Sequence, residues 1–467
     1  MIAFPRRVAR RFRAACAKCI CGRPRGPAPP VVIRQSKGRV TLTATFPEVT
    51  LELACGTPES GTEVLIVPMA VLDEIGSVAP ELVGLEGTGM LTGVARWTKK
   101  GEPRTHEIDL ILPGKQHDAL ARPQELEPVP YRFLELLHEA GRTATREDGR
   151  FALSRVQVRG QKGQVIATDG KVAVIFGGFA LPFIEDLLVP AVPLFGSPEL
   201  RDDAEVRVGR TPKHFVVNAG DWTVWLGVAT VGKFPDVAAV VPKHAPTAVT
   251  LDRGDAAGLL PQLSQMPGQS HEHRPVTLDA NGVLKVHARD DTTRESKEVV
   301  LARSSVTGPT AKAVLDRRAF ARMLALGCTA LRFTPDKAVV GTGEGVTVLA
   351  AQLDRELAVV PNETAIRVAA EPDSINPTPV TTPERSTVMK PDTNGTAHTG
   401  RRDPPPDEPI DPLDAAEELR LALVEVANKA GRLVAALKAS RKERKALASV
   451  WATLDQLRPP QRNGVKP

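Results

Sequence analysis

The feature that most constrains this chain is a sequence pattern that occurs three times, about 120 residues apart. A short apolar run that leads into a helical stretch begins at residues 65, 187 and 314. A strand-like run that starts beside a glycine begins at residues 37, 162 and 281. This spacing is one domain length and far exceeds the repeat of a solenoid. We therefore predict three copies of one domain.

Each copy is expected to hold two half-copies of a helix followed by short strands. In the second copy, four apolar residues follow Pro130 at helical spacing, namely Phe133, Leu134, Leu137 and Ala140. Alternating strand-like runs come next and are separated by glycines. Asp169-Gly170 predicts a hairpin turn, because a primed turn needs positive φ. The predicted fold class is α+β, with antiparallel strands.

Composition and the repeat divide the chain into six segments. They are a basic leader (1–30), a divergent first copy (31–122), a second copy (123–244), a third copy (245–361), a linker (362–411) and a helix (412–458). The linker is rich in proline and contains no Phe, Trp or Tyr. It cannot bury enough apolar surface to offset chain entropy, so we predict that it is disordered.

The leader carries eight cations and no acid, whereas the other 437 residues have a net charge of −2. Bulk positive charge therefore does not mark the body as a nucleic-acid binder. Two structures fit the leader. We favour a disordered basic tail. The alternative is a remodelled first helix with Val8, Phe12 and Ala15 facing inward and the arginines outward.

The C-terminal helix has a heptad seam, in which Leu419, Leu423, Val426, Ala430, Leu433 and Leu437 alternate steps of four and three. A helix placed beyond a long linker must bury such a seam against something. Self-association or partner docking is therefore favoured over a DNA-binding arm.

Several classes of protein are excluded by simpler features. No window is apolar enough for a membrane helix, and the basic N-terminus lacks the apolar core of a signal peptide. Five cysteines in a chain of 467 residues do not make a disulfide framework. We expect a cytoplasmic protein.

Several short motifs resemble those of the bacterial sliding clamps, the beta subunit of DNA polymerase III. Residues 167–173 (ATDGKVA) resemble the family hairpin ATDGHRLA. Gly220-Asp221, then residues 233–236 (KFPD) and 240–242 (VVP), resemble its crossover into the third domain. Residues 61–75 resemble its GSVTVPAKLLLDIL stretch. The resemblance covers residues 31–354, and the altered N-terminus and added C-terminal helix mark a divergent member.

The resemblance implies three clamp domains in each chain and a head-to-tail homodimer that encircles duplex DNA. Such a ring tethers DNA polymerase, is placed on DNA by a clamp loader, and has no catalytic residues, no cofactor and no metal. The DNA-facing residues implied on the helices are Arg132, Arg142, Arg317, Arg318 and Arg322. Sliding needs weak contacts to phosphate without base readout.

The family also binds a partner peptide between its second and third domains. The matching positions here are Leu153, Thr168, Gly170, Lys171, Val172, Ala173 and Pro242. The family has His-Arg-Leu where this chain has Lys171-Val172-Ala173, and the usual C-terminal wall of the pocket is replaced. The pocket is therefore expected to be reshaped or lost.

Other motifs are weaker signals of chemistry. Cys16, Cys19 and Cys21 supply three thiols where zinc needs four ligands, so free thiols are expected. His271 and His273 lie in a polar stretch that predicts an exposed loop. No enzyme motif is present. The rival to a ring is a clamp-fold scaffold that does not encircle DNA and acts through its C-terminal coiled-coil helix.

Overall fold

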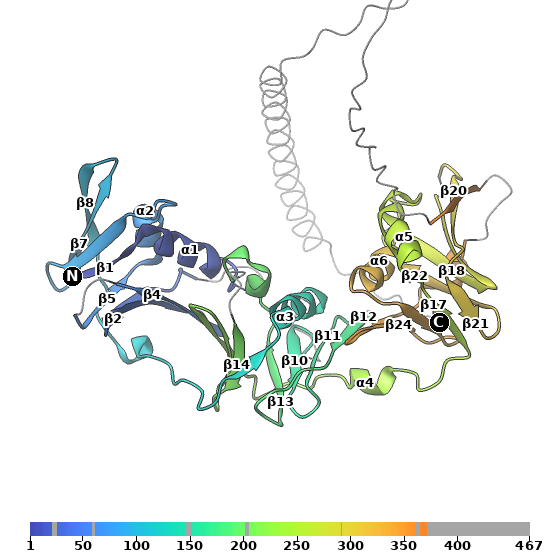
Figure 1. Ribbon diagram of the computed structural model, residues 1–467, viewed down its shortest axis with the longest axis horizontal. Coiled ribbons are helices and arrows are strands. Elements are labelled where there is room, and N and C mark those ends of the chain that lie inside the picture. Colours follow the sequence, from blue (N-terminus) through green and yellow to red (C-terminus); the bar gives the residue numbers. More distant parts are fainter. Residues whose placement is uncertain are drawn as a thin grey trace, which may run out of the picture. The chain divides into compact units, whose positions relative to one another are not determined.

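The computed structural model of the chain describes residues 1–20, 26–57, 61–145, 152–200, 205–290, 292–359 and 365–370. All of them lie in one compact unit, Met1–Pro377. The predicted linker beyond residue 370 and the predicted helix at 412–458 lie outside the described residues. Strands dominate this part of the chain, and short helices are inserted between them (Figure 1).

The first repeat starts at the N-terminus. Its elements are β1 (Ile2–Pro5), α1 (Arg6–Cys16), β2 (Val31–Ser36), β3 (Arg39–Thr45), β4 (Val49–Gly56), β5 (Glu63–Val67), α2 (Met69–Ile75), β6 (Leu82–Gly87), β7 (Thr92–Lys99) and β8 (Glu102–Asp109). A single 3-10 turn, η1 (Lys115–His117), lies in the connection to the second repeat.

The second repeat has the same order of elements, except that two 3-10 turns stand in place of the second α-helix. Its elements are β9 (Glu127–Val129), α3 (Arg132–Thr143), β10 (Arg155–Arg159), β11 (Gln164–Thr168), β12 (Val172–Phe176), β13 (Asp186–Pro190), η2 (Pro193–Gly196), η3 (Pro198–Leu200), β14 (Val206–Arg210), β15 (His214–Ala219) and β16 (Trp222–Gly227). The short helix α4 (Val237–Val240) lies in the crossover to the third repeat.

The third repeat follows the pattern again with two additional strands, β21 within it and β26 at its end. Its elements are β17 (Thr247–Thr250), α5 (Arg253–Gln265), β18 (Pro275–Asn281), β19 (Val283–Arg289), β20 (Ser296–Leu301), β21 (Ser305–Thr307), β22 (Ala311–Asp316), α6 (Arg317–Ala325), β23 (Ala330–Phe333), β24 (Val339–Gly343) and β25 (Val346–Ala350). After η4 (Arg355–Leu357) comes β26 (Ile366–Ala369).

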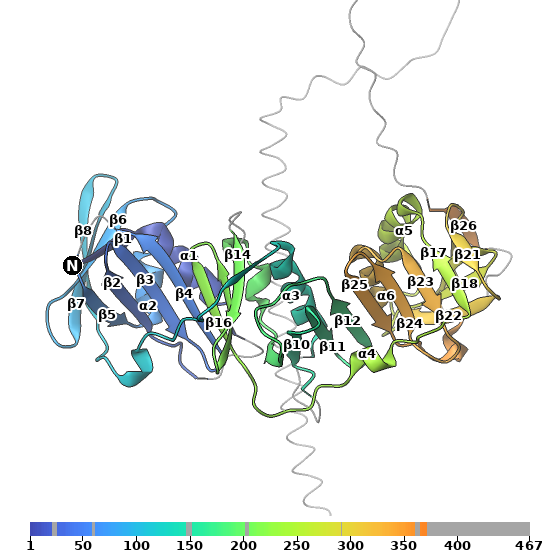
Figure 2. The same cartoon turned by 60° about the horizontal axis from the view of Figure 1, so that its bottom comes forward.

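Four sheets hold these strands, and two of the sheets run from one repeat into the next (Figure 2). One eight-stranded sheet has the order β5-β2-β3-β4-β16-β15-β14-β9, and a nine-stranded sheet has the order β13-β10-β11-β12-β25-β24-β23-β17-β21. The outer sheets have the orders β1-β6-β7-β8 and β22-β18-β19-β20-β26. Adjacent repeats are therefore joined by backbone hydrogen bonds, at β4–β16 and at β12–β25.

The glycines that recur in the sequence lie in equivalent turns of the three repeats. Gly38, Gly163 and Gly282 connect β2 to β3, β10 to β11 and β18 to β19, and their φ angles are 74°, 56° and 73°. Side chains other than that of glycine are strained in this region of φ. The glycines recur along the sequence because the same turn is built three times.

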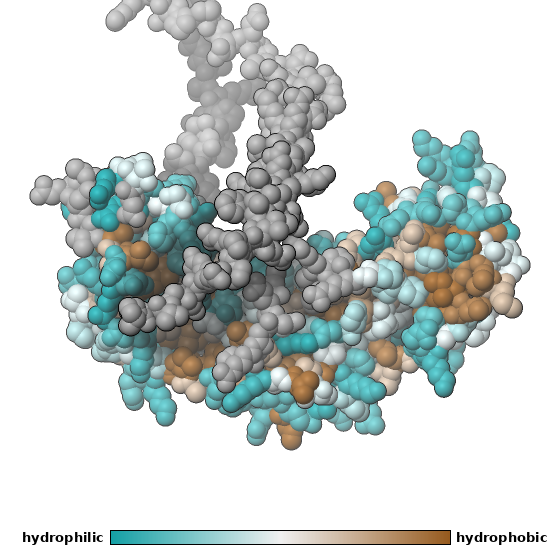
Figure 3. Space-filling model, turned by 180° about the vertical axis from the view of Figure 1, so that it is seen from behind, coloured by the Kyte–Doolittle hydropathy of each residue, from teal (hydrophilic) through white to brown (hydrophobic). Residues whose placement is uncertain are grey.

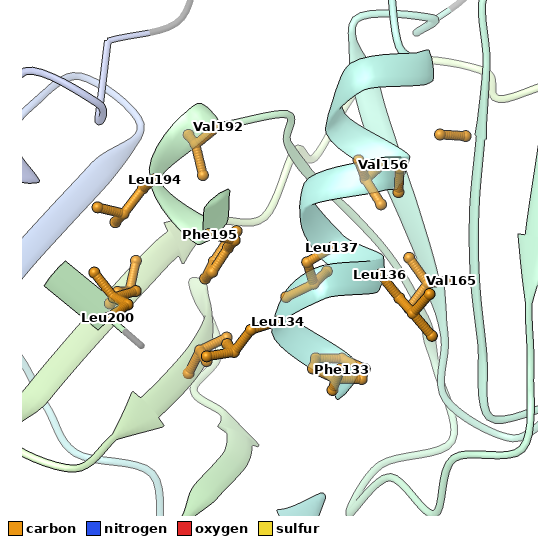
Figure 4. Packing of buried hydrophobic residues seen from close by; sticks show 14 of the residues in the cluster. Phe133, Leu134, Leu136, Leu137, Val156, Val165, Val192, Leu194, Phe195 and Leu200 are labelled. Carbon is orange, nitrogen blue, oxygen red and sulfur yellow. The ribbon is translucent and has the colours of Figure 1, made fainter. Parts of the chain in front are cut away.

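The helix predicted after Pro130 is confirmed as α3, and its apolar face is fully used. Phe133, Leu134, Leu137 and Ala140 are all buried. Figure 4 shows Leu136 of α3 facing Val165 on one side, while η2, which carries Leu194 and Phe195, packs on the other side of the helix. From behind, the surface of the described residues is mostly hydrophilic, with separate hydrophobic patches (Figure 3).

The favoured interpretation of the leader, a disordered tail, is wrong for residues 2–16. They form β1 and α1, and β1 pairs antiparallel with β6. Val8, Phe12 and Ala15 are buried, as the alternative required, but Arg6, which it placed outward, is buried too and donates to the backbone oxygen of Ile75. The charge of the leader does not prevent it from folding, because Arg7 and Arg10 lie on the exposed face of α1 while the apolar residues pack on the other face.

Three further expectations need correction. The second half of repeat two begins with η2 and η3 in place of an α-helix, since Pro198 lacks the N–H that an α-helix needs and clashes with the preceding turn. The predicted linker starts too early, because β26 lies within it and pairs with β20. In the Asp169-Gly170 turn only Gly170 has positive φ; the Asp169 carboxylate instead accepts from the N–H of Lys171 and of Val172.

Candidate nucleic-acid interface and partner pocket

The helices contact one another through all three repeats. α2 packs against α1, α1 reaches η3, η2 packs against α3, and α5 packs against α6. Arg322 makes the link between α6 and α3, because its guanidinium donates to the backbone oxygen and the carboxylate of Glu139. We call this continuous series of helices and 3-10 turns the helix row, and it is the candidate nucleic-acid interface.

Exposed arginines are spread along the helix row: Arg7, Arg10, Arg132, Arg142, Arg253 and Arg318. Arg7, Arg10 and Arg253 make no ion pair with any residue that the structure describes. Exposed, unpaired cations of this kind attract phosphate at long range, and contacts to phosphate carry no information about base sequence.

Arg132 and Arg318, which the resemblance placed towards DNA, are exposed, and each already has a partner. Nη2 of Arg132 donates to the backbone oxygen of Glu344, 3.0 Å away. Arg318 forms a bidentate pair with Asp316, with Nη2–Oδ2 at 2.7 Å and Nε–Oδ1 at 3.1 Å. The pairing fixes the direction of the Arg318 side chain and neutralises part of its charge.

Arg142 and Arg322 share one carboxylate, that of Glu139. Nη1 of Arg142 lies 2.8 Å from Oε1, and Nη2 of Arg322 lies 3.1 Å from Oε2. Arg142 remains 61 % exposed, whereas Arg322 is only 18 % exposed. Burial lowers the pKa of Arg322 despite the nearby carboxylate. Arg142 is thus available to a phosphate, and Arg322 connects two repeats.

The expectation that Arg317 faces DNA is wrong. Arg317 is 3 % exposed, and its Nη1 donates to the backbone oxygen of Met266 at 2.7 Å. Its Nη2 donates to the backbone oxygen of Pro267. Burial lowers the pKa of this guanidinium to about 10. Arg317 therefore joins the first turn of α6 to the end of α5. Its place beside Arg318 in the sequence gave no sign that its side chain is buried.

The acidic residues near the helix row are largely occupied. Asp73 pairs with Arg13, and Glu74 pairs with His106. Asp252 caps the N-terminus of α5 by accepting from the N–H of Gly254 and of Asp255. Asp255 itself is buried and accepts from the backbone N–H of Arg303 and Ser304. These carboxylates therefore oppose the exposed arginines less than their number in the sequence suggests.

Arg7, Arg10 and Arg253 were not among the individual residues predicted to face DNA. The signal for Arg7 and Arg10 was present, because they are three residues apart on a helix whose opposite face holds Val8 and Phe12. Assigning them depended on choosing the helix over the tail. Arg253 follows the N-cap residue of α5, which is a local signal that sequence reasoning missed.

The structure brings most of the predicted pocket residues together in the β11–β12 hairpin. The hydroxyl of Thr168 donates to the backbone oxygen of Val172 at 2.8 Å and accepts from the N–H of Gly170 at 3.0 Å. A Cβ placed on Gly170 would lie 4.0 Å from Cδ1 of Leu153, so Leu153 adjoins the turn. The Thr168 hydroxyl therefore fixes the hairpin against which Leu153 lies.

This hairpin also meets the third repeat. β12 pairs with β25, and the backbone oxygen of Lys171 accepts from the N–H of Ala351 at 2.8 Å. Beside the junction lies a small apolar cluster, separate from the main core, which comprises Ile166, Ala173, Ile175, Val237, Val340 and Leu349. Val241, next to Pro242, packs against it. Ala173 and the crossover segment before Pro242 thus lie at one junction of two repeats.

The remaining motifs do not form a site. Cys16 and Cys19 are buried on and just after α1, and burial raises the pKa of Cys16 well above its usual range. Cys21 lies outside the described residues. Within the described ranges no three His, Cys, Asp or Glu side chains are grouped so that they could hold a metal ion. No helix of those ranges is long and apolar enough to span a membrane.

Comparison with known proteins gives no match to a protein-family model and no match among curated proteins. Solved structures do match. A sliding clamp (DNA polymerase III subunit beta) from Pseudomonas aeruginosa is 15 % identical, with a TM-score of 0.62, and covers 76 % of this chain and 99 % of its own. A putative DNA polymerase III beta subunit from Eubacterium rectale is 13 % identical, with a TM-score of 0.63 and the same coverage.

The corresponding beta subunit from Thermotoga maritima is 15 % identical, with a TM-score of 0.60, and covers 76 % of this chain and 99 % of its own. Nearly the whole length of each of these proteins therefore aligns with this chain. The chain has the fold of the DNA polymerase III beta sliding clamps, at a sequence identity that marks it as divergent.

Proposed function

Because the chain has the fold of these sliding clamps, we propose that two copies close head to tail into a ring around duplex DNA. The ring slides on DNA and tethers DNA polymerase or other DNA-acting proteins, and a clamp loader places it there. It acts in the cytoplasm, without catalysis of its own and without a cofactor or metal.

The observation that carries this proposal is the way in which the repeats join. Two junctions within the chain, β4–β16 and β12–β25, have the same antiparallel geometry. Each joins the last strand of one half-repeat to the last strand of another. Two half-repeats take part in neither junction. They are the second half of the first repeat, whose last strand is β8, and the first half of the third repeat, whose last strand is β20. Repeats that join in one geometry at both junctions favour a closed ring, because two further junctions of this kind close it.

The helix row supplies the DNA-binding surface in this proposal. Its exposed arginines are Arg7, Arg10, Arg132, Arg142, Arg253 and Arg318. Half of them are already paired with an acceptor of the chain. Contacts of this kind give weak, salt-dependent binding, which suits a ring that must move along DNA.

The partner site in this proposal is the junction of the second and third repeats, at Leu153, Thr168, Gly170, Lys171, Val172, Ala173 and Pro242. Nearby side chains offer apolar surface to a peptide, since Val240 is 63 % exposed and Val231 is 85 % exposed. Lys171 is exposed where the family has a histidine, so a peptide with an acidic residue at that point suits this chain.

Topological retention on DNA tests the proposal. The full-length protein is diluted to dissociate with a nicked circular plasmid, concentrated to reassociate, and separated from free protein in high salt. Half of the sample is then cut once with a restriction enzyme. A ring stays on the circle and is lost from the linear form. Equal retention on both forms, or none on either, overturns the proposal.

A second function has one observation in its favour. The edge of β20 is already occupied by β26, so a single chain as described presents no free edge there. This favours a clamp-fold scaffold that does not encircle DNA and acts through the predicted coiled-coil helix at 412–458. Such a scaffold shows no difference between circular and linear DNA, and it loses its partner when residues 378–467 are deleted.

A further inference from the structure

In the first half of each of the first two repeats, three consecutive strands form a meander, and its last strand joins the sheet of the next repeat. In the order β5-β2-β3-β4 the strand β4 continues into β16, and in the order β13-β10-β11-β12 the strand β12 continues into β25. The third repeat has the order β22-β18-β19-β20. β20 is therefore the equivalent of β4 and β12, and it is the strand from which a further junction would start.

The strand that would complete this junction is also defined by the repeat. β16 ends the order β9-β14-β15-β16, and β25 ends the order β17-β23-β24-β25. The first repeat has the order β1-β6-β7-β8, so β8 is the equivalent of β16 and β25. Among the described strands, β8 pairs only with β7. An exposed eight-residue edge of this kind is a template for pairing with another chain.

The corresponding edge of β20 is not free. β26 lies along it in parallel, with Lys297, Glu298, Val299 and Val300 opposite Ile366, Arg367, Val368 and Ala369. The two internal junctions are antiparallel, so β26 is not a copy of the missing strand. It is a segment from beyond the third repeat that occupies the place of that strand.

Few side-chain contacts hold β26 itself, and none of its four residues is buried, whereas the next residue, Ala370, is buried in the main core and its backbone oxygen accepts from Arg303. Arg367 Nε lies 3.5 Å from Oε1 of Glu298, a buried carboxylate on β20. The N–H of Ala370 donates to the backbone oxygen of Val300 at 3.0 Å, and Nε2 of Gln262 donates to that of Ala369 at 3.3 Å. Ile366 is 53 % exposed. The pairing spans four residues, whereas β4–β16 and β12–β25 each span five.

We propose that β26 is a displaceable strap that masks the ring-closing edge of β20. β26 and the β8 of a second copy compete for the same backbone groups, so the chain closes into a ring only when the strap is released. This inference rests on the proposed ring. It adds that closure is regulated from within the chain, through a strand that directly precedes the C-terminal segment.

Proline substitutions test the strap because they remove one backbone donor at a chosen side of a strand. The N–H of Ala370 points to β20, so that of Val368 does too, and that of Ala369 points away. Val368→Pro therefore breaks the strap, and Ala369→Pro is the matched control. On β8, Pro103 pairs with Thr98 and has no N–H to donate to β7, so its backbone nitrogen faces the free edge. Thr105 lies two residues further along the strand, so its N–H also faces the free edge. Thr105→Pro blocks the free edge of β8.

The measurement is the self-association of the full-length protein by analytical ultracentrifugation over a range of concentrations. We expect Val368→Pro to tighten dimerisation at least about tenfold, and Ala369→Pro to match the unsubstituted protein. Adding Thr105→Pro to Val368→Pro should abolish the gain. This last variant also separates ring closure, which is proposed to use β8, from association through the predicted C-terminal helix.

Two outcomes overturn the strap, and they are distinguishable. If the unsubstituted protein and Val368→Pro dimerise equally and Thr105→Pro weakens both, the ring stands and the strap is wrong. If no variant shows association that is sensitive to Thr105→Pro, the proposed ring fails and the strap fails with it. Thermal unfolding of each variant confirms that the described repeats remain folded.

Discussion

Arg322 on α6 and Glu139 on α3 are separated by 183 residues in sequence, and Nη2 of the arginine lies 3.1 Å from Oε2 of the glutamate. The pair joins the second repeat to the third beside the backbone junction of β12 and β25. Both side chains are mostly shielded from solvent. A residue that the family resemblance assigned to DNA therefore belongs to the contact between repeats.

Replacing Arg322 with Leu should lower the free energy of unfolding by about 1–3 kcal/mol, because Glu139 loses a charged donor in a shielded place. Urea denaturation measures this effect. The matched control is Arg355→Leu, which removes an ion pair that is 76 % exposed at both partners, and should change the unfolding free energy by less than about 1 kcal/mol. Equal effects would contradict the structural role of Arg322.

Arg317 and Arg318 are neighbours in sequence, and their substitutions should have opposite consequences. Arg317→Leu leaves the backbone oxygens of Met266 and Pro267 without their donor and should cost about 2–3 kcal/mol of unfolding free energy. Arg318→Leu should leave stability nearly unchanged and weaken retention on DNA. A stable Arg317→Leu protein that fails only in DNA retention would show that the sequence-based assignment was right.

Phe12→Ala tests whether the leader belongs to the core. Phe12 is fully buried and stacks on Trp222 of the second repeat, with ring centroids 6.3 Å apart. The substitution should lower the unfolding free energy by about 3–5 kcal/mol. Arg10→Ala, on the exposed face of the same helix, should change it by less than about 0.5 kcal/mol. A wild-type melting curve for Phe12→Ala would mean that the leader is a tail.

Charge reversal on α1 tests the helix row as the DNA-binding surface. The double variant Arg7→Glu and Arg10→Glu should bind DNA more weakly at low salt and show a shallower dependence of binding on salt, since fewer phosphate contacts release fewer counterions. The control is Lys162→Glu with Lys213→Glu, an equal change of charge at two exposed strand turns. If both double variants bind DNA equally weakly, total charge matters and the helix row does not.

His287 should make stability depend on pH. It is 1 % exposed on β19, and burial lowers its pKa below 6.5 even though Glu298 lies nearby. Below pH 6.5 the unfolded chain binds a proton that the folded chain resists, so the free energy of unfolding falls as the pH drops towards the folded pKa. Urea titrations at pH 7.5 and 5.5 should show this loss, and His287→Gln should reduce it. An unchanged loss in the variant would assign it to other groups.

The repeat was predictable because the same turn chemistry recurs. Gly38, Gly163 and Gly282 each have a positive φ. Because other side chains are strained in this region, a turn that needs it selects glycine, and the glycine is visible in the sequence. The helix after Pro130 was equally readable, because its inward side chains follow the helical period. These features depend on local geometry, which neighbouring residues determine.

The site was less predictable because it depends on contacts between distant residues. Arg317 and Arg318 look alike in sequence, and only the position of the α5 C-terminus determines that the first is buried. The charge of α1 likewise concealed its apolar face. β26 gave no strand signal above the proline-rich background, since its pairing depends on an edge supplied by β20.

The shared sheets mean that the boundaries drawn along the sequence are not boundaries of folding. β4 takes its outer hydrogen bonds from β16, which lies in another repeat. A fragment that ends near residue 122 would leave the backbone groups at the β4 edge unpaired, and Phe12 would lose its contact with the indole of Trp222. Such a piece invites aggregation, so anyone dissecting this chain should expect neighbouring repeats to melt together and to be expressible only as a unit.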